Sequence, residues 1–206
     1  MSGAFPISSS AFSTMGIKSI QNTIISKSDS GKKLARQIDG QRFAFTAQII
    51  TGKRSDIYGE LMAFIIKQRS QKENFTIIPP EIEDARGVET GTLAVNGSHT
   101  VGDTTIAIDG FAADSANRLR AGDFIKFNGH TKVYMVVSDV TSSSNAATVT
   151  IEPPLVSNLS DDEVVSYDNI PFTVYLTNDI QEFGVVGADK DGNLLYKFEL
   201  DVEEFL

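Results

Sequence analysis

The sequence predicts a mainly β fold: a β-sandwich with one α-helix, into which a small OB-like β-barrel is inserted. Three features of the 206 residues predict this class. Short runs of β-branched and aromatic residues are separated by turn residues, one segment has the spacing of an amphipathic helix, and the middle of the chain is richer in Gly, Asp, Ser and Thr than its flanks. We therefore expect a discontinuous domain, residues 1–82 and 170–206, interrupted by an inserted domain, residues 83–169.

The first part of the discontinuous domain is expected to begin with an arm, residues 1–15, that carries a few apolar anchors. The β-branched residues that follow predict a strand over residues 16–26. A second strand is predicted over residues 42–50, because its side chains alternate between apolar and polar. The residues on its apolar face are Phe43, Phe45, Ala47 and Ile49.

One helix is predicted from Ser55 to about Arg69. Ser55 is a suitable N-cap, and the basic residues near the other end suit the helix dipole. A short strand over residues 75–78 follows, and the prolines at 79 and 80 end it. The apolar residues at helical spacing are Tyr58, Leu61, Met62, Ile65 and Ile66.

The inserted domain reads as a succession of short strands, with no long helix among them. Asn-Gly and Asp-Gly pairs at residues 96–97, 109–110 and 128–129 mark turns between them. About five such strands in fewer than 90 residues are typical of an OB-like barrel. The strand candidates are residues 91–95, 104–108, 123–127, 133–140, 148–152 and 163–167.

After residue 170 the strand pattern of the first part returns. Strands are predicted over residues 171–176, 181–186 and 194–200, with a tight turn at Asp191-Gly192. On this interpretation they complete the sheet that begins before residue 80, so the ends of the insertion lie close together.

Charge is unevenly distributed along the chain, whose net charge is −9. Residues 1–80 carry 11 Lys and Arg against 5 Asp and Glu, a balance of +6. Residues 81–170 carry 5 against 14, a balance of −9, and residues 171–206 carry 2 against 8, a balance of −6. The outer segments compensate each other, which agrees with their forming one domain. The acidic insertion would repel phosphates, so specific nucleic-acid binding is not expected.

The residue types indicate no enzyme. The absence of cysteine excludes thiolate chemistry and cysteine-ligated metals, and the chain has only two histidines, His99 and His130, which we interpret as surface residues of turns. No catalytic, cofactor-binding or metal-binding residue is assigned, and no segment is long and apolar enough to predict membrane insertion. We interpret the turn carboxylates of the insertion as solvated surface: Asp114, Asp123, Asp161, Asp162 and Glu163.

The most specific stretch of the sequence is a hairpin in the insertion, residues 119–127 (LRAGDFIKF) followed by residues 130–136 (HTKVYMV). Together with the order strand, helix, strand, proline pair and the returning strand at residue 171, it resembles the distal tail protein of long-tailed (siphovirus) phages, in the form that carries an inserted OB-fold domain. The resemblance implies a virion protein of the tail tip, or baseplate, that is assembled in the host cytoplasm.

The same resemblance implies a homo-hexameric ring that joins the tail tube to the tail-tip hub and leaves a lumen for DNA. The implied partners are further copies of the chain, the tail tube protein and the tail hub protein, with the tape measure protein as an additional candidate. The family has no catalytic motif, so the resemblance transfers no site residues.

Charge alone suggests one subunit contact. In a ring, unlike surfaces of neighbouring copies meet, and complementary charge can fix their register. We therefore predict that a basic pair of one copy contacts the acidic C-terminal segment of the next. The predicted contact residues are Lys53, Arg54, Glu199, Asp201, Glu203 and Glu204.

Three other functions remain open from the sequence. One is a glycan-binding adsorption module of the tail tip, although the absence of Trp disfavours it. Another is a tail tube protein, which would stack into long tubes. The third is a lytic enzyme acting on the cell wall.

Overall fold

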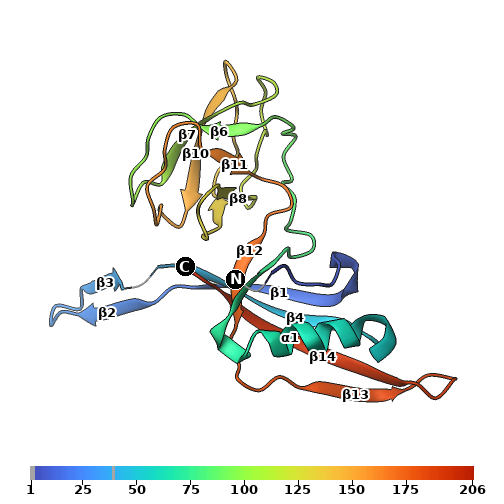
Figure 1. The fold of residues 1–206 in the computed structure, drawn as a ribbon. Helices are drawn as coiled ribbons and strands as arrows, with labels where there is room; N and C mark the ends of the chain where they lie inside the picture. The colour runs from blue at the N-terminus through green and yellow to red at the C-terminus, as the bar shows by residue number, and fades with distance from the viewer. Residues whose placement is uncertain (1–2, 39) are drawn as a thin grey trace. The chain divides into compact units, whose positions relative to one another are not determined.

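The structure is a computed structural model that describes residues 3–38 and 40–206, and its chain divides into two compact units (Figure 1). Unit 1 comprises Met1–Ile77 and Thr173–Leu206, and unit 2 comprises Ile78–Phe172. The predicted class is confirmed, since the described residues form a mainly β structure with one α-helix and a closed β-barrel.

Unit 1 is built on a sheet with the strand order β1-β4-β14-β12-β5, to which β13 is added alongside β14. The central strands β4 and β14 are long and antiparallel. The bounds are β1 (Phe12–Ile20), β4 (Arg42–Lys53), β5 (Asn74–Ile77), β12 (Phe172–Leu176), β13 (Phe183–Ala188) and β14 (Leu194–Glu204).

Alternation in β4 and β14 gives the sheet one buried and one polar face. The predicted apolar residues of β4 are all buried, and register places Phe45 opposite Val202 and Ala47 opposite Leu200, both of which are also buried. Because side chains alternate, the intervening residues of both strands lie on the other face, which we call the polar face. It contains Thr46, Gln48, Glu199, Asp201 and Glu203.

The predicted helix begins differently from its sequence signal. A turn of π-helix, η2 (Arg54–Tyr58), precedes helix α1 (Gly59–Lys67), and the hydroxyl of Ser55 donates to Asp56 instead of capping the helix. Tyr58 holds this turn against the sheet, because its hydroxyl donates to the Ile50 carbonyl at 2.9 Å. Leu61 and Ile65 are the buried residues of α1.

The strand predicted over residues 16–26 is two strands. β1 ends at Ile20, and β2 (Thr23–Lys27) pairs with β3 (Lys33–Gln37), which the sequence pattern did not predict. This β2–β3 hairpin continues the β1–β4 ribbon beyond the sheet and forms the arm that carries both labels in Figure 1.

The N-terminal segment is anchored to the sheet, but the predicted arm of residues 1–15 is too long, because β1 already begins at Phe12. The backbone N–H of Phe5 donates to the carbonyl of Thr76 on β5 at 2.7 Å. The Phe5 ring lies within 6.0 Å, centroid to centroid, of Phe12, Phe64 and Phe75. The remaining short helices of unit 1 are η1 (Ser9–Ala11) and η3 (Ser70–Lys72).

Unit 2 is a closed barrel with the order β10-β7-β6-β11-β8-β9. In the described residues the barrel has six strands, one more than the expected number of about five. β11 closes it, because β11 pairs with both β6 and β8. Side chains such as Ile106, Phe127 and Val149 fill its interior and are fully buried. The bounds are β6 (Leu93–Val95), β7 (Thr105–Asp109), β8 (Phe124–Phe127), β9 (Tyr134–Val136), β10 (Ala146–Glu152) and β11 (Val164–Ser166).

Because each unit has its own core, damage to one core is expected to leave the other unit intact. Phe127→Ala should lower the unfolding free energy of unit 2 by about 3–5 kcal/mol, the cost of emptying a buried aromatic site. Chemical denaturation of the full chain, followed by amide hydrogen exchange in each unit, measures this. Val137→Ala, at an exposed site of the same unit, is the control. Equal loss of protection in both units would contradict the prediction.

Candidate functional site

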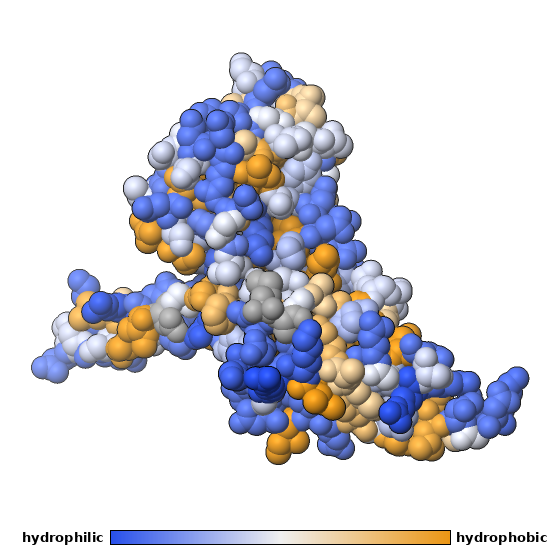
Figure 2. All heavy atoms as spheres, viewed as in Figure 1, coloured by the Kyte–Doolittle hydropathy of each residue, from blue (hydrophilic) through white to orange (hydrophobic). Residues whose placement is uncertain are grey.

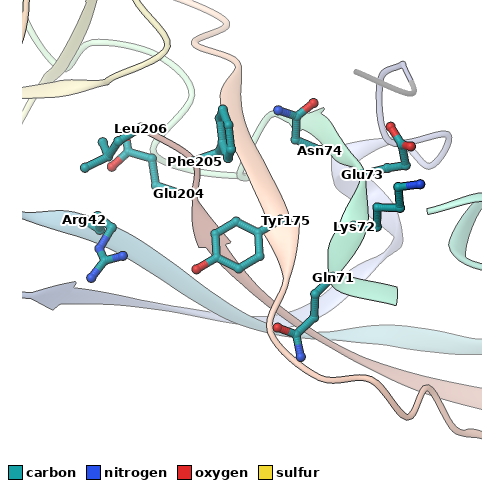
Figure 3. Close-up of a pocket in the computed structure, with 9 residues that line it drawn as sticks. All are labelled: Arg42, Gln71, Lys72, Glu73, Asn74, Tyr175, Glu204, Phe205 and Leu206. Carbon is teal, nitrogen blue, oxygen red and sulfur yellow. The ribbon is translucent and has the colours of Figure 1, made fainter. Parts of the chain in front are cut away.

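Two hollows of about 560 Å³ each could serve as a site in unit 1. In the first, Tyr175 lies between Arg42 on one side and Gln71 and Lys72 on the other (Figure 3). Its full lining is Arg42, Gln71, Lys72, Glu73, Asn74, Tyr175, Glu204, Phe205 and Leu206.

Two polar residues of this pocket, Arg42 and Tyr175, interact with Glu203, which lies beside it. Arg42 Nη1 lies 3.1 Å from Glu203 Oε1. Burial raises the pKa of Tyr175, and the neighbouring Glu203 carboxylate raises it further. This arrangement ties β4, β12 and β14 together, and it contains no nucleophile paired with a base among the residues that line it.

The second hollow, which we call the β4–β13 groove, lies near the other end of β4. Two carboxylates, Glu182 and Glu199, and one cation, Lys197, accompany the exposed side chain of Ile50. Its full lining is Ser13, Gln48, Ile49, Ile50, Thr51, Glu182, Gly184, Lys197, Phe198 and Glu199.

The predicted contact residues all lie on β4, β14 or the turn after β4, but they are not brought together as one patch. Lys53 forms an ion pair with Asp189 of its own chain, in the turn between β13 and β14. Hydrogen bonds from Lys53 and Asn193 hold the pKa of Asp189 well below its usual range. Asp189 also accepts the backbone N–H of Asp191 and of Asn193, each at 2.9 Å, so Lys53 fastens a structured turn to β4.

The predicted acidic residues divide between the two faces of the sheet. Glu204 lies on the buried face, has no exposed surface, and accepts the backbone N–H of Phe43 at 3.0 Å. It therefore supports the fold from within. Asp201 accepts the hydroxyl of Thr46 at 2.8 Å on the polar face, and Glu203 is paired with Arg42. Arg54 and Glu199 are exposed.

In unit 2, the distinctive hairpin of the sequence is organised by a buried carboxylate. Asp123, interpreted from the sequence as solvated, is 2% exposed. It accepts the backbone N–H groups of Arg86 and Arg120 and the Arg86 Nε at 3.2 Å. Gly122 has a φ of +94°, a conformation that glycine adopts without strain. Asp123 and Gly122 thus fix the turn that leads into β8.

A second buried carboxylate, Glu89, forms an ion pair with Arg118, whose Nε lies 2.6 Å away. Glu89 also accepts the backbone N–H groups of Thr90, Gly91 and Ala112. Burial alone would raise the pKa of Glu89, but these four hydrogen bonds outweigh it and lower the pKa to about 2. The pair is therefore charged at neutral pH and joins the segment before β6 to the loop between β7 and β8.

Residues 86–170 match the family model described as distal tail protein pb9, B domain. Unit 2, which contains these residues, is similar to a distal tail protein B domain, and we call it the B domain below. The resemblance stated from the sequence is thereby confirmed, and the match supports a structural role in a phage tail. No curated protein matches the chain.

The two histidines of the B domain are structural, which corrects their interpretation as plain surface. His99 Nε2 accepts the backbone N–H of Ala107 at 3.2 Å. His130 lies against the ring of Phe127, and its Nδ1 is 3.2 Å from the Tyr134 hydroxyl. Both are half-buried and hold loops of the barrel.

Within residues 3–38 and 40–206, no group of three or more His, Asp and Glu side chains is placed to hold a metal ion. In the same residues, none of the helices has the length and apolar content needed to cross a bilayer.

The Glu89–Arg118 pair should make the B domain sensitive to acid. The folded-state pKa of Glu89 is lowered, so its stabilisation is complete above the unfolded-state pKa of about 4.5 and is lost as the pH falls toward about 2. Unfolding free energies measured across this window should fall with pH in the native protein, and Glu89→Gln should flatten the slope. Glu152→Gln, at an exposed residue, serves as the control, and an unchanged slope in Glu89→Gln would contradict the prediction.

Lys53 and Arg54 should differ, although they are adjacent cations. Lys53→Gln removes the ion pair that holds Asp189, so amide hydrogen exchange over residues 189–193 should accelerate. Arg54→Gln is the matched control and should leave exchange in that turn unchanged. If both variants accelerate exchange equally, general charge rather than the Lys53–Asp189 pair holds the turn.

Proposed function

We propose that this chain is a structural protein of a phage tail that assembles head to tail into a closed ring, of six copies, at the distal end of the tail. The ring would join the tail tube to the tail-tip hub and leave a lumen for DNA. The B domain supports the tail role. Unit 1 supports self-association, and the following observation carries that step.

Among the described residues, the edge strands of the unit 1 sheet are β1, β13 and β5, and the N-terminal arm already contacts β5 through the Ala4–Thr76 bridge. β1 lies at one end of the strand order and pairs with β4. β13 pairs with β14, on the side of β14 that faces away from β4. Unpaired backbone groups on such strands are templates for another chain. Since the two edges lie on opposite sides of one sheet, copies can join edge to edge in one direction, and such heterologous contacts give a closed ring when the rotation closes.

The sequence of β13 suits a contact between chains. Its residues, FGVVGA, carry no charge, and Val185 and Val186 are 52% and 47% exposed. Edge strands that remain in water commonly carry lysine or another charge that prevents pairing. β13 lacks this protection, so we assign it to a surface that a neighbouring copy covers.

A lysine placed in β13 should weaken the ring. In Val185→Lys, a charge would have to be buried at the contact, and self-association should weaken at least roughly tenfold, about 1.4 kcal/mol. Light scattering and negative-stain imaging of the full chain measure this. Val137→Lys, at a B-domain site of similar exposure, is the control. Rings that persist unchanged in Val185→Lys would contradict the role of β13, and long tubes in the native protein would indicate a tail tube protein.

A further inference from the structure

The β2–β3 hairpin leaves a large apolar surface uncovered. Every residue of its two strands is exposed, including Ile24 and Leu34 at 56% and 55%, and Ile38 just beyond β3 is 56% exposed. Figure 2 shows apolar side chains along this projecting arm. Isolated two-stranded hairpins are marginally stable in water, so this one gains stability only if a partner covers it.

One face of the hairpin combines apolar and basic residues. Register places Ile24 opposite Arg36, and Leu34, Arg36 and Ile38 alternate onto that same side. We call Ile24, Leu34, Arg36 and Ile38 the docking face. The hairpin as a whole, residues 23–37, carries four cations, Lys27, Lys32, Lys33 and Arg36, against the single acid Asp29.

The β4–β13 groove has the complementary chemistry. Its carboxylates, Glu182 and Glu199, are exposed and exceed its one cation, and Ile50 is 41% exposed beside them. The docking face has matching groups. The guanidinium of Arg36 can pair with the two carboxylates of the groove. The aliphatic side chains around Arg36 can bury apolar area against Ile50.

The hairpin and the groove lie at opposite ends of the same ribbon. β2 and β3 continue from Ile20 and Arg42, whereas the groove lies at residues 48–51 of β4 and beyond, near β13. Figure 1 shows the hairpin pointing away from the β13–β14 end of unit 1. A hairpin therefore cannot fold back into the groove of its own chain, but it can reach that of another copy.

We infer that the docking face of one copy covers Ile50 in the β4–β13 groove of the next copy, with the Arg36 guanidinium between Glu182 and Glu199. This inference rests on the proposed head-to-tail ring and names a pair of surfaces that would fasten it. Nucleic acid is a poorer occupant of the hairpin, because phosphates would pair with its cations and leave Ile24, Leu34 and Ile38 in water.

Cysteine cross-linking tests the contact directly, since the chain contains no cysteine of its own. Full-length protein carrying both Arg36→Cys and Glu199→Cys should, on mild oxidation, give a ladder of disulfide-linked species that ends at the ring size. Either substitution alone can give dimers at most. The mismatched pair Arg36→Cys with Lys72→Cys, the latter in the other pocket, should not form the ladder.

Charge exchange supplies an independent readout. Arg36→Glu and Glu199→Arg should each weaken self-association about tenfold, and the two together should restore most of it. All these sites are exposed, so folding should be unaffected.

Failure of the inference can be told apart from failure of the ring. If the native protein forms rings, but the double-cysteine variant gives no ladder and the charge exchange gives no rescue, the docking contact is wrong and the ring is not. Native protein that stays monomeric, with no ladder at any concentration reached, would overturn both.

Discussion

The pairing of β4 with β14 is the constraint on which unit 1 depends. It joins residues about 150 positions apart and sets the register in which Phe45 meets Val202 and Ala47 meets Leu200. A shift of one residue would turn this apolar set toward the polar face and bury Asp201 and Glu203 instead. The same register brings the β13–β14 turn next to Lys53, so the ion pair with Asp189 depends on it as well. Glu204 reinforces it from the buried side through the Phe43 N–H.

Local alternation and turn chemistry were sufficient to predict most of the strands. The six strand candidates of the insertion each correspond to a strand of the barrel. Inward- and outward-facing residues alternate along barrel strands, and Asn-Gly and Asp-Gly turns mark where several of these strands end. β3 escaped prediction because Lys33–Gln37 carries no alternating apolar pattern; an exposed hairpin has no core to impose one. The helix start was misjudged at Ser55 because the Tyr58–Ile50 hydrogen bond, a tertiary contact, decides the geometry of that turn.

Side-chain roles were harder to predict than strands, because a charge in a sequence does not reveal its partner. Lys53 and Arg54 look equivalent, yet one is committed to Asp189 and the other is exposed. Asp123 sits in a Gly-containing turn that suggests a solvated surface, but two donors of the distant Arg86 and the backbone N–H of the nearby Arg120 enclose it. The Ala121-Gly122-Asp123 stretch of the hairpin was nevertheless informative, because its buried carboxylate and positive-φ glycine shape the turn that leads into β8.

The two units treat their strand edges in opposite ways. The barrel of the B domain pairs every one of its strands on both sides and so leaves no edge for another chain. Unit 1 keeps β1 and β13 paired on one side only and extends an uncovered hairpin. Exposed edges and apolar arms favour aggregation, and a protein that retains them gains only if a specific partner covers them. Since both features belong to unit 1, the proposed ring would be held together by that unit and not by the barrel.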